Sequence, residues 1–241
     1  MATPCLKEMP DAVATEGPVT SSLWLSPNGS RHVIQNHLNL DRGAFHGIFV
    51  DDIPWVMIER YTKPGDLVYD CFGGSGTTWE VATKLGRRCV SNDINPKHPK
   101  VIKCDTLKFC LSEQPQLILA HPPYHNIIKF SNEEGELSAC KSLEEYMCKL
   151  RAILMRVVGF LKGGGTFVLV LGEIYIGGQE ISLGHRTAMW LQDSVGLKLK
   201  GVIVKNQGEG KGGHKKQTNL WKWRMQKHGL WSLAWDSIFV F

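Results

Sequence analysis

The chain has 241 residues, of which 43% are hydrophobic and 21% are charged, so its composition is that of a globular protein with a sizeable core. No apolar run approaches the roughly 18–20 residues of a membrane helix, and no secretory signal is visible, so we expect neither feature. Seven scattered cysteines form no CxxC pair, which favours reduced thiols and a cytoplasmic location.

The net charge of +5 is concentrated in one segment of the chain. Residues 205–228 hold seven Lys and Arg against one acid, a sum of +6, so the remaining residues sum to −1. The segment is rich in glycine and contains Trp221 and Trp223. Lysines displace counterions from phosphates and indoles stack on bases, so this composition favours contact with a nucleic acid over the alternative of a solvated loop.

Residues 1–30 contain four prolines and are expected to form a flexible lead-in, and residues 31–241 to form a single domain. From about residue 54, short β-rich runs alternate with helical stretches. Strands are predicted at 67–71, 88–93, 100–105, 117–120, 166–171, 199–205 and 237–241, and helices at 77–85, 142–161 and 185–194. This alternation predicts an α/β fold with a mainly parallel sheet, whose ligands bind at the carboxyl ends of the strands.

The first predicted strand runs into a helix through a glycine loop, residues 70–78, which reads Asp-Cys-Phe-Gly-Gly-Ser-Gly-Thr-Thr. A P-loop is excluded because no lysine follows Gly76, and a dinucleotide fingerprint is excluded because its third glycine is absent. The start of the helix can still bind an anionic group. Acids at three successive strand ends, Asp70, Asp93 and Asp105, suit ribose hydroxyls and an adenine amino group, although single acids at such places are often caps or turn residues.

Four segments carry a resemblance to a known family: 45–49, 53–54, 61–66 and 70–78. They resemble the DNA amino-methyltransferases, whose glycine loop reads D-P-F-x-G-S-G-T-T, and here Cys71 replaces the proline. The resemblance covers roughly three quarters of the chain, to about Val204. It implies a Rossmann-like class I methyltransferase fold, with a mainly parallel seven-stranded sheet, an antiparallel C-terminal strand and helices on both faces.

The resemblance also implies S-adenosylmethionine as the cofactor. Phe72 and the loop glycines would line its methionine end, Thr77 or Thr78 and the 49–54 stretch would bind its carboxylate, and Asp93 would hold its ribose. The full set of residues assigned to the cofactor is Phe49, Ile53, Pro54, Asp70, Phe72, Gly73, Gly74, Ser75, Gly76, Thr77, Thr78, Asp93 and Asp105.

The strand 117–120 leads into the predicted catalytic residues, His121, Pro122, Pro123 and Tyr124. The family has Asp, Asn or Ser where this chain has His121. A side-chain acceptor and the Pro122 carbonyl would bind the N–H groups of an exocyclic amine and free its lone pair, while Tyr124 would stack on a flipped base. Imidazole accepts only when it is neutral, so we expect turnover to fall as the pH falls through the pKa of His121, for which about 6.5 is the unperturbed reference. His121 and His125 are spaced i, i+4, but the two prolines prevent a helix, so no metal site is predicted.

The predicted reaction is methyl transfer to a flipped base of double-stranded DNA, with adenine N6 slightly preferred over cytosine N4, as in restriction–modification. No large target-recognition insert is present, so residues 125–141 and 205–232 are expected to contact the DNA. The predicted DNA-binding residues are Lys129, Lys211, Lys215, Lys216, Lys222 and Arg224. A catalytically weak DNA-binding protein and an RNA-base methyltransferase are the alternatives. A DNA-bound enzyme would be nucleoid-associated, and the choice between monomer and homodimer stays open.

Overall fold

The structure is a computed structural model, and it describes residues 23–24, 50–206, 226–230 and 235–241. Most of the predicted lead-in, the 45–49 segment and most of the basic segment lie outside the described residues. Phe49, Lys211, Lys215, Lys216, Lys222 and Arg224 are therefore not placed. Among the described residues, no helix has the length and hydropathy needed to cross a membrane.

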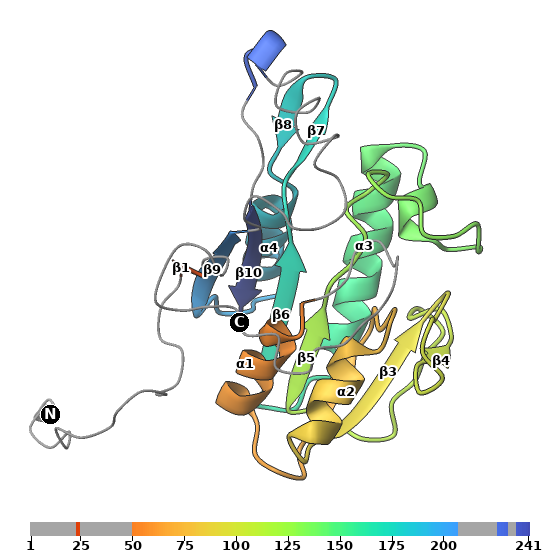
Figure 1. The fold of residues 1–241 in the computed structure, drawn as a ribbon, viewed down its shortest axis with the longest axis vertical. Helices are drawn as coiled ribbons and strands as arrows, with labels where there is room; N and C mark the ends of the chain where they lie inside the picture. Colours follow the sequence, from red (N-terminus) through yellow and green to blue (C-terminus); the bar gives the residue numbers. More distant parts are fainter. Residues whose placement is uncertain (1–22, 25–49, 207–225, 231–234) are drawn as a thin grey trace, which may run out of the picture.

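The described residues form one mixed sheet with the strand order β1-β9-β10-β6-β5-β2-β3-β4 (Figure 1). The central strands are β2 (Leu67–Asp70), β5 (Leu117–Ala120) and β6 (Thr166–Leu171), which pair in parallel. On one side follow β3 (Arg88–Asp93) and β4 (Ile102–Lys103). On the other side, β10 (Trp235–Val240) runs antiparallel between β6 and β9 (Gly201–Asn206).

These seven strands confirm the predicted mainly parallel sheet with an antiparallel C-terminal strand. The sequence did not predict β1 (Leu23–Trp24), a two-residue strand that adds to the edge of the sheet by pairing in parallel with β9. It also did not predict a separate hairpin, which consists of β7 (Ile174–Ile176) and β8 (Gln179–Ile181) and extends beyond the end of β6 (Figure 1).

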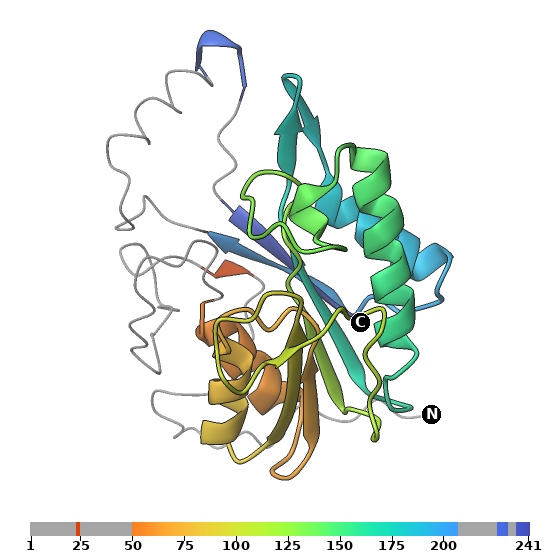
Figure 2. The ribbon, with the colours of Figure 1, turned by 90° about the vertical axis from the view of Figure 1, so that its right-hand side faces the viewer.

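Helices cover both faces of the sheet, as predicted (Figure 2). One face carries α1 (Asp52–Tyr61) and α2 (Thr77–Lys84), and the other carries α3 (Leu143–Val158) and α4 (Leu183–Asp193). Every residue of β6 is buried. Phe167, Leu169 and Leu171 pack in the core under α3 and α4, while Val168 and Val170 pack in the core under α1 and α2, because alternate side chains of a strand point to opposite faces.

Several predicted elements have different bounds in the structure. The helix predicted at 142–161 begins at Leu143, because the Ser142 hydroxyl caps it by accepting a hydrogen bond from the Glu145 N–H at 3.1 Å, and it ends at Val158 before Gly159. The strand predicted at 100–105 is reduced to the two residues of β4. Helix α1 was not predicted; it accommodates Pro54 because the proline lies in the first turn, where no N–H donor is needed.

Candidate active site

The two signature loops of the sequence lie side by side at the carboxyl edge of the sheet. The glycine loop leaves β2 after Asp70, and the His-Pro-Pro-Tyr loop leaves β5 after Ala120. These strands are paired neighbours, with Asp70 opposite Leu119, so the two loops begin about 5 Å apart. Cys71, which replaces the family's proline, donates its backbone N–H to the Leu119 carbonyl at 3.4 Å, a bond that a proline could not make.

The glycine loop is a tight turn that packs against β3. Gly76 has a φ of 80° and donates its N–H to the Gly73 carbonyl at 2.7 Å, which closes the turn just before α2 begins at Thr77. A Cβ at Gly73 would collide with the Ser91 hydroxyl, and one at Gly76 would collide with the His98 ring. At these two positions glycine is therefore required by packing within the protein.

The acids predicted to bind the cofactor hold the loop together in the structure. Asp70 accepts the Phe72 N–H at 2.9 Å, and Asp93 accepts the N–H groups of Gly74 at 2.9 Å and Asn95 at 2.7 Å. Burial raises the pKa of Asp70 to about 6 and also raises the pKa of Asp93 above its usual value. Each carboxylate oxygen has two lone pairs, so these bonds leave acceptor capacity for a ligand.

Asp105 and the predicted DNA-contact segment 125–141 meet at the ends of β3 and β4. Asp105 accepts the Leu107 N–H at 2.9 Å, and its carboxylate lies close to Gly135. Lys103 forms an ion pair with Glu133 at 2.7 Å, which ties the segment to β4. Lys129 is exposed on the same segment. Part of the segment thus packs on the strand ends, and its contact with DNA stays a prediction.

Two of the four predicted catalytic residues, His121 and Tyr124, start a short network of polar side chains. The His121 Nε2 lies 3.2 Å from the Tyr124 hydroxyl, and this hydroxyl donates to the Asp236 Oδ1 at 3.1 Å. Lys205 donates from its Nζ to the Asp236 Oδ2 at 3.0 Å. Tyr124 also lies against Gly172, where a side chain would displace its ring. The predicted residues therefore connect to two residues on β9 and β10.

The Pro123 carbonyl is held by two hydrogen bonds. The Tyr146 hydroxyl of α3 donates to it at 2.7 Å, and the His125 N–H donates to it at 3.1 Å. His125 has a φ of 51°, which is uncommon outside glycine, and its buried ring lies edge-on against Tyr146 at 5.4 Å between centroids. These contacts fix the turn that follows Pro122.

Sequence reasoning missed Asp236, Lys205 and Tyr146. Lys205 and Asp236 face each other across the antiparallel ladder of β9 and β10 and are both largely buried. Lys205 had been assigned to the basic segment, but its ion pair and burial remove it from any DNA surface. The sequence does show an acid near the start of the last strand and a lysine near the end of the preceding one. Connecting the two would have required the prediction that these strands pair antiparallel.

Ile53 and Pro54, the described part of the other predicted cofactor segment, are buried in the first turn of α1. Beside them Asp52 has its pKa raised to about 8 by burial and by the neighbouring Asp51, an effect that Lys205 opposes. In the part of the chain that the structure describes, no three His, Cys, Asp or Glu residues are grouped as metal ligands would be.

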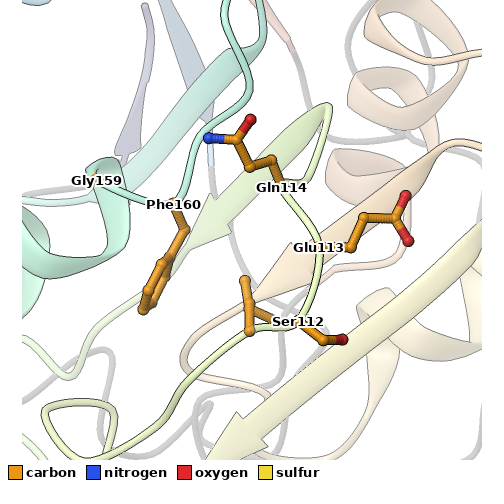
Figure 3. A pocket seen from close by; sticks show the side chains of 6 residues that line it. Ser112, Glu113, Gln114, Gly159 and Phe160 are labelled. Atoms are coloured by element: carbon orange, nitrogen blue, oxygen red, sulfur yellow. The ribbon is translucent and has the colours of Figure 1, made fainter.

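A shallow cavity of about 140 Å³ lies at the opposite edge of the sheet, before β5 (Figure 3). Its lining residues are Leu111, Ser112, Glu113, Gln114, Gly159 and Phe160. The Glu113 carboxylate points away from Phe160 and forms an exposed ion pair with Arg88. The cavity contains none of the signature residues, so it is separate from the candidate site.

The pH range expected for His121 from the sequence is wrong in light of the structure. The pKa of His121 is lowered to about 4, mainly by burial; Asp236 opposes this shift and Lys205 adds to it. A lowered pKa means that the neutral, accepting ring persists down to about pH 4, instead of being lost near 6.5. The lowered pKa also affects stability. As the pH falls from about 6.5 to about 4, the unfolded chain binds a proton at His121 before the folded protein does, so the free energy of unfolding decreases.

We therefore predict that the ratio of the single-turnover methyl-transfer rates of the wild type and His121→Asn stays constant between pH 5 and pH 8. Asparagine does not titrate, so the ratio cancels every other ionisation of the reaction. Rapid-quench assays at fixed ionic strength would measure both rates. A ratio that falls with a midpoint near pH 6.5 would contradict the structural assignment.

Comparisons with known proteins support the resemblance. Residues 7–103 match the family model described as DNA methylase. A stretch of 42 residues is 50% identical to a Type II methyltransferase, M1.MboII of Moraxella bovis, and covers 17% of this chain and 16% of that relative. The chain thus spans about a sixth of the curated relative that it matches.

The fold is also found in solved structures. A 1,6-didemethyltoxoflavin-N1-methyltransferase of Burkholderia thailandensis, solved with S-adenosylhomocysteine, superposes with a TM-score of 0.50 at 11% identity. The superposition covers 79% of this chain and 76% of the other. At this identity the similarity shows the methyltransferase fold and nothing about the substrate.

Proposed function

We propose that the protein transfers a methyl group to an exocyclic amino group of a DNA base. The premise is its resemblance to the DNA amino-methyltransferases, which the match of residues 7–103 to the DNA methylase family supports. The observation that carries the proposal is the adjacency of β2 and β5. It brings a loop suited to the methyl donor beside a loop suited to the amine that accepts the methyl group.

The residues present fit S-adenosylmethionine as the cofactor. The start of α2 offers backbone N–H groups to its carboxylate, and Asp93, at the end of β3, has acceptor capacity for its ribose hydroxyls. Among the described residues, the position above Gly74 is open, because a Cβ there would meet no described atom closer than 3.9 Å. Such a cofactor supplies a methyl group activated by a positively charged sulfur.

The His-Pro-Pro-Tyr loop would bind the amine. His121 and the Pro122 carbonyl would each accept one N–H of the amino group, which directs the nitrogen lone pair toward the methyl group. The amino nitrogen would take the methyl group that the cofactor supplies, the C–S bonding electrons would stay on sulfur, and the methylated nitrogen would release one proton to solvent. Tyr124 would stack on the extruded base, adenine being slightly preferred over cytosine.

One assay tests the proposed function directly. The protein is incubated with S-adenosylmethionine labelled in its methyl group and with duplex DNA or RNA, and the polymer is digested to nucleosides. We expect label in N6-methyladenosine or N4-methylcytidine of the deoxy series. Label found only in RNA would replace the DNA assignment by an RNA-base methyltransferase. DNA binding without any label would favour a catalytically weak DNA-binding protein.

The role of the basic segment can be tested by charge reversal. The triple variant Lys211→Glu, Lys215→Glu and Lys216→Glu should weaken DNA binding and flatten the dependence of log K on log salt, because each lost phosphate contact removes about 0.9 from the slope. Fluorescence anisotropy at several salt concentrations measures both effects, and cofactor affinity should stay nearly unchanged.

A matched control reverses three exposed lysines that precede β2, β6 and β9, namely Lys63, Lys162 and Lys198. Because these strands run parallel, the three lysines lie at the edge of the sheet opposite to the proposed site. The control variant should keep most of the salt dependence. An equal loss of slope in both triple variants would argue for unspecific attraction by net charge.

A further inference from the structure

The hydrogen-bond network behind Tyr124 links residues from three parts of the chain. It runs from His121 on the loop after β5, through the Tyr124 hydroxyl, to Asp236 on β10 and Lys205 on β9. The three distances are 3.2, 3.1 and 3.0 Å, each within hydrogen-bonding range. Asp236 and Lys205 are about nine-tenths buried, so water competes little with these contacts.

Counting protons along the network determines the state of the imidazole. A tyrosine hydroxyl has one proton to donate and can also accept. The Asp236 carboxylate is in an ion pair with Lys205 and can only accept, so the Tyr124 proton points to Asp236. The contact between the Tyr124 oxygen and the His121 Nε2 then requires the proton to be on Nε2. In a neutral ring this leaves the lone pair on Nδ1.

We propose that Asp236 is a positioning residue that, through Tyr124, holds His121 in the Nε2–H tautomer, so that Nδ1 accepts an N–H of the target amino group. The second half of this statement rests on the proposed function. The family uses an oxygen of Asp, Asn or Ser as this acceptor. A carboxylate, amide or hydroxyl oxygen always carries a lone pair that can accept a hydrogen bond. A histidine accepts from only one nitrogen, so it needs a partner that selects the tautomer.

The charges around the ring are consistent with a neutral imidazole. Asp236 of β10 and Lys205 of β9 face it with opposite signs, and Lys205 also interacts with Asp52 of α1. Burial of the ring, aided by the charge of Lys205, outweighs the attraction of the Asp236 carboxylate for a proton on the imidazole, so the carboxylate orients the tyrosine proton while the ring stays neutral. Lys205 therefore acts on the His121 tautomer indirectly, by holding the Asp236 carboxylate in place.

The tautomer can be observed without turnover. Long-range ¹H–¹⁵N spectra of the full chain labelled at histidine distinguish the protonated from the unprotonated ring nitrogen, and the signals missing from His121→Asn assign His121. We expect Nε2 protonated and Nδ1 unprotonated at pH 7, and loss of this fixed pattern in Tyr124→Phe and Asp236→Asn. An Nδ1–H tautomer in the wild type, or spectra unaffected by both substitutions, would overturn the proposal.

A double-mutant cycle tests the link to the reaction. Asp236→Asn should lower kcat roughly 10–100-fold in the wild type, the usual cost of losing a residue that orients a histidine. It should lower kcat much less in His121→Asn, where no tautomer has to be selected. Equal losses in both backgrounds would show that Asp236 has only a structural role. If the tautomer is as expected but the wild type methylates no nucleic acid, the proposed function is wrong, while the role of Asp236 and Tyr124 in selecting the His121 tautomer is confirmed.

Discussion

Replacing Lys205 by methionine is expected to lower the free energy of unfolding by about 3–5 kcal/mol, the usual effect of breaking a buried ion pair by removing one partner. The substitution leaves the Asp236 carboxylate largely buried without its ammonium partner, while methionine fills a similar volume. Urea unfolding followed by tryptophan fluorescence measures the change, and a loss below about 1 kcal/mol would contradict the importance of the pair.

The double variant Lys205→Met, Asp236→Leu separates stability from function. Removing both charges leaves no unpaired ion, so most of the lost stability should return. The same variant lacks the carboxylate that orients Tyr124 and His121, so its methyl-transfer rate should stay low. A double variant that recovers both the stability and the rate would show that the pair only supports the fold.

The second large effect is expected at His121. His121→Leu removes the side-chain acceptor and should lower kcat by about 10²–10³-fold, the cost of losing one preoriented hydrogen bond to the reacting group. His121→Asn and His121→Asp restore an oxygen acceptor of the kind that the family uses, and should keep much more activity. The binding of S-adenosylmethionine, measured by calorimetry, should be similar in all three variants.

Two outcomes would contradict the role given to His121. If His121→Leu is as active as the wild type, the amine is bound by other groups. If His121→Leu, His121→Asn and His121→Asp are all equally inactive and also lose cofactor binding, the ring has a structural role in shaping the loop.

The sequence predicted the fold and the positions of the two signature loops because these depend on local patterns. Strands 117–120 and 166–171 are apolar or β-branched runs bounded by turns, and the structure has them with the same bounds. Strand 88–93, which is more polar, also has the predicted bounds. The structure places the loops 70–78 and 121–124 at the ends of neighbouring strands, as expected from a parallel sheet. The roles of individual residues in binding cofactor and base stay predictions.

The parts that the sequence did not reveal depend on contacts between distant residues. Asp236 lies 112 positions from Tyr124, and no local spacing connects them. The charge sum was misleading for the same reason: Lys205 counts toward the basic segment in the sequence, but it neutralises Asp236 in the structure. Without Lys205, residues 206–228 hold six Lys and Arg against one acid, a sum of +5.

The shift in the pKa of His121 was also beyond the sequence, because burial depends on tertiary packing. A reference value near 6.5 describes a histidine in water. Here the ring lies beside Tyr124, Asp236 and Lys205, and the loss of hydration outweighs the attraction to the carboxylate. Loss of the neutral His121 ring is therefore expected near pH 4, and no longer near pH 6.5.

The antiparallel direction of β10 has a consequence for how this scaffold can change. Because β9 ends and β10 begins at the same edge of the sheet, the stretch between Asn206 and Trp235 leaves and re-enters the fold beside the His-Pro-Pro-Tyr loop. Insertions or deletions in that stretch need not alter the register of any strand. If this stretch contacts the target, as we propose, changes in its length and sequence could alter target preference, by evolution or by design, while every strand of the sheet is kept.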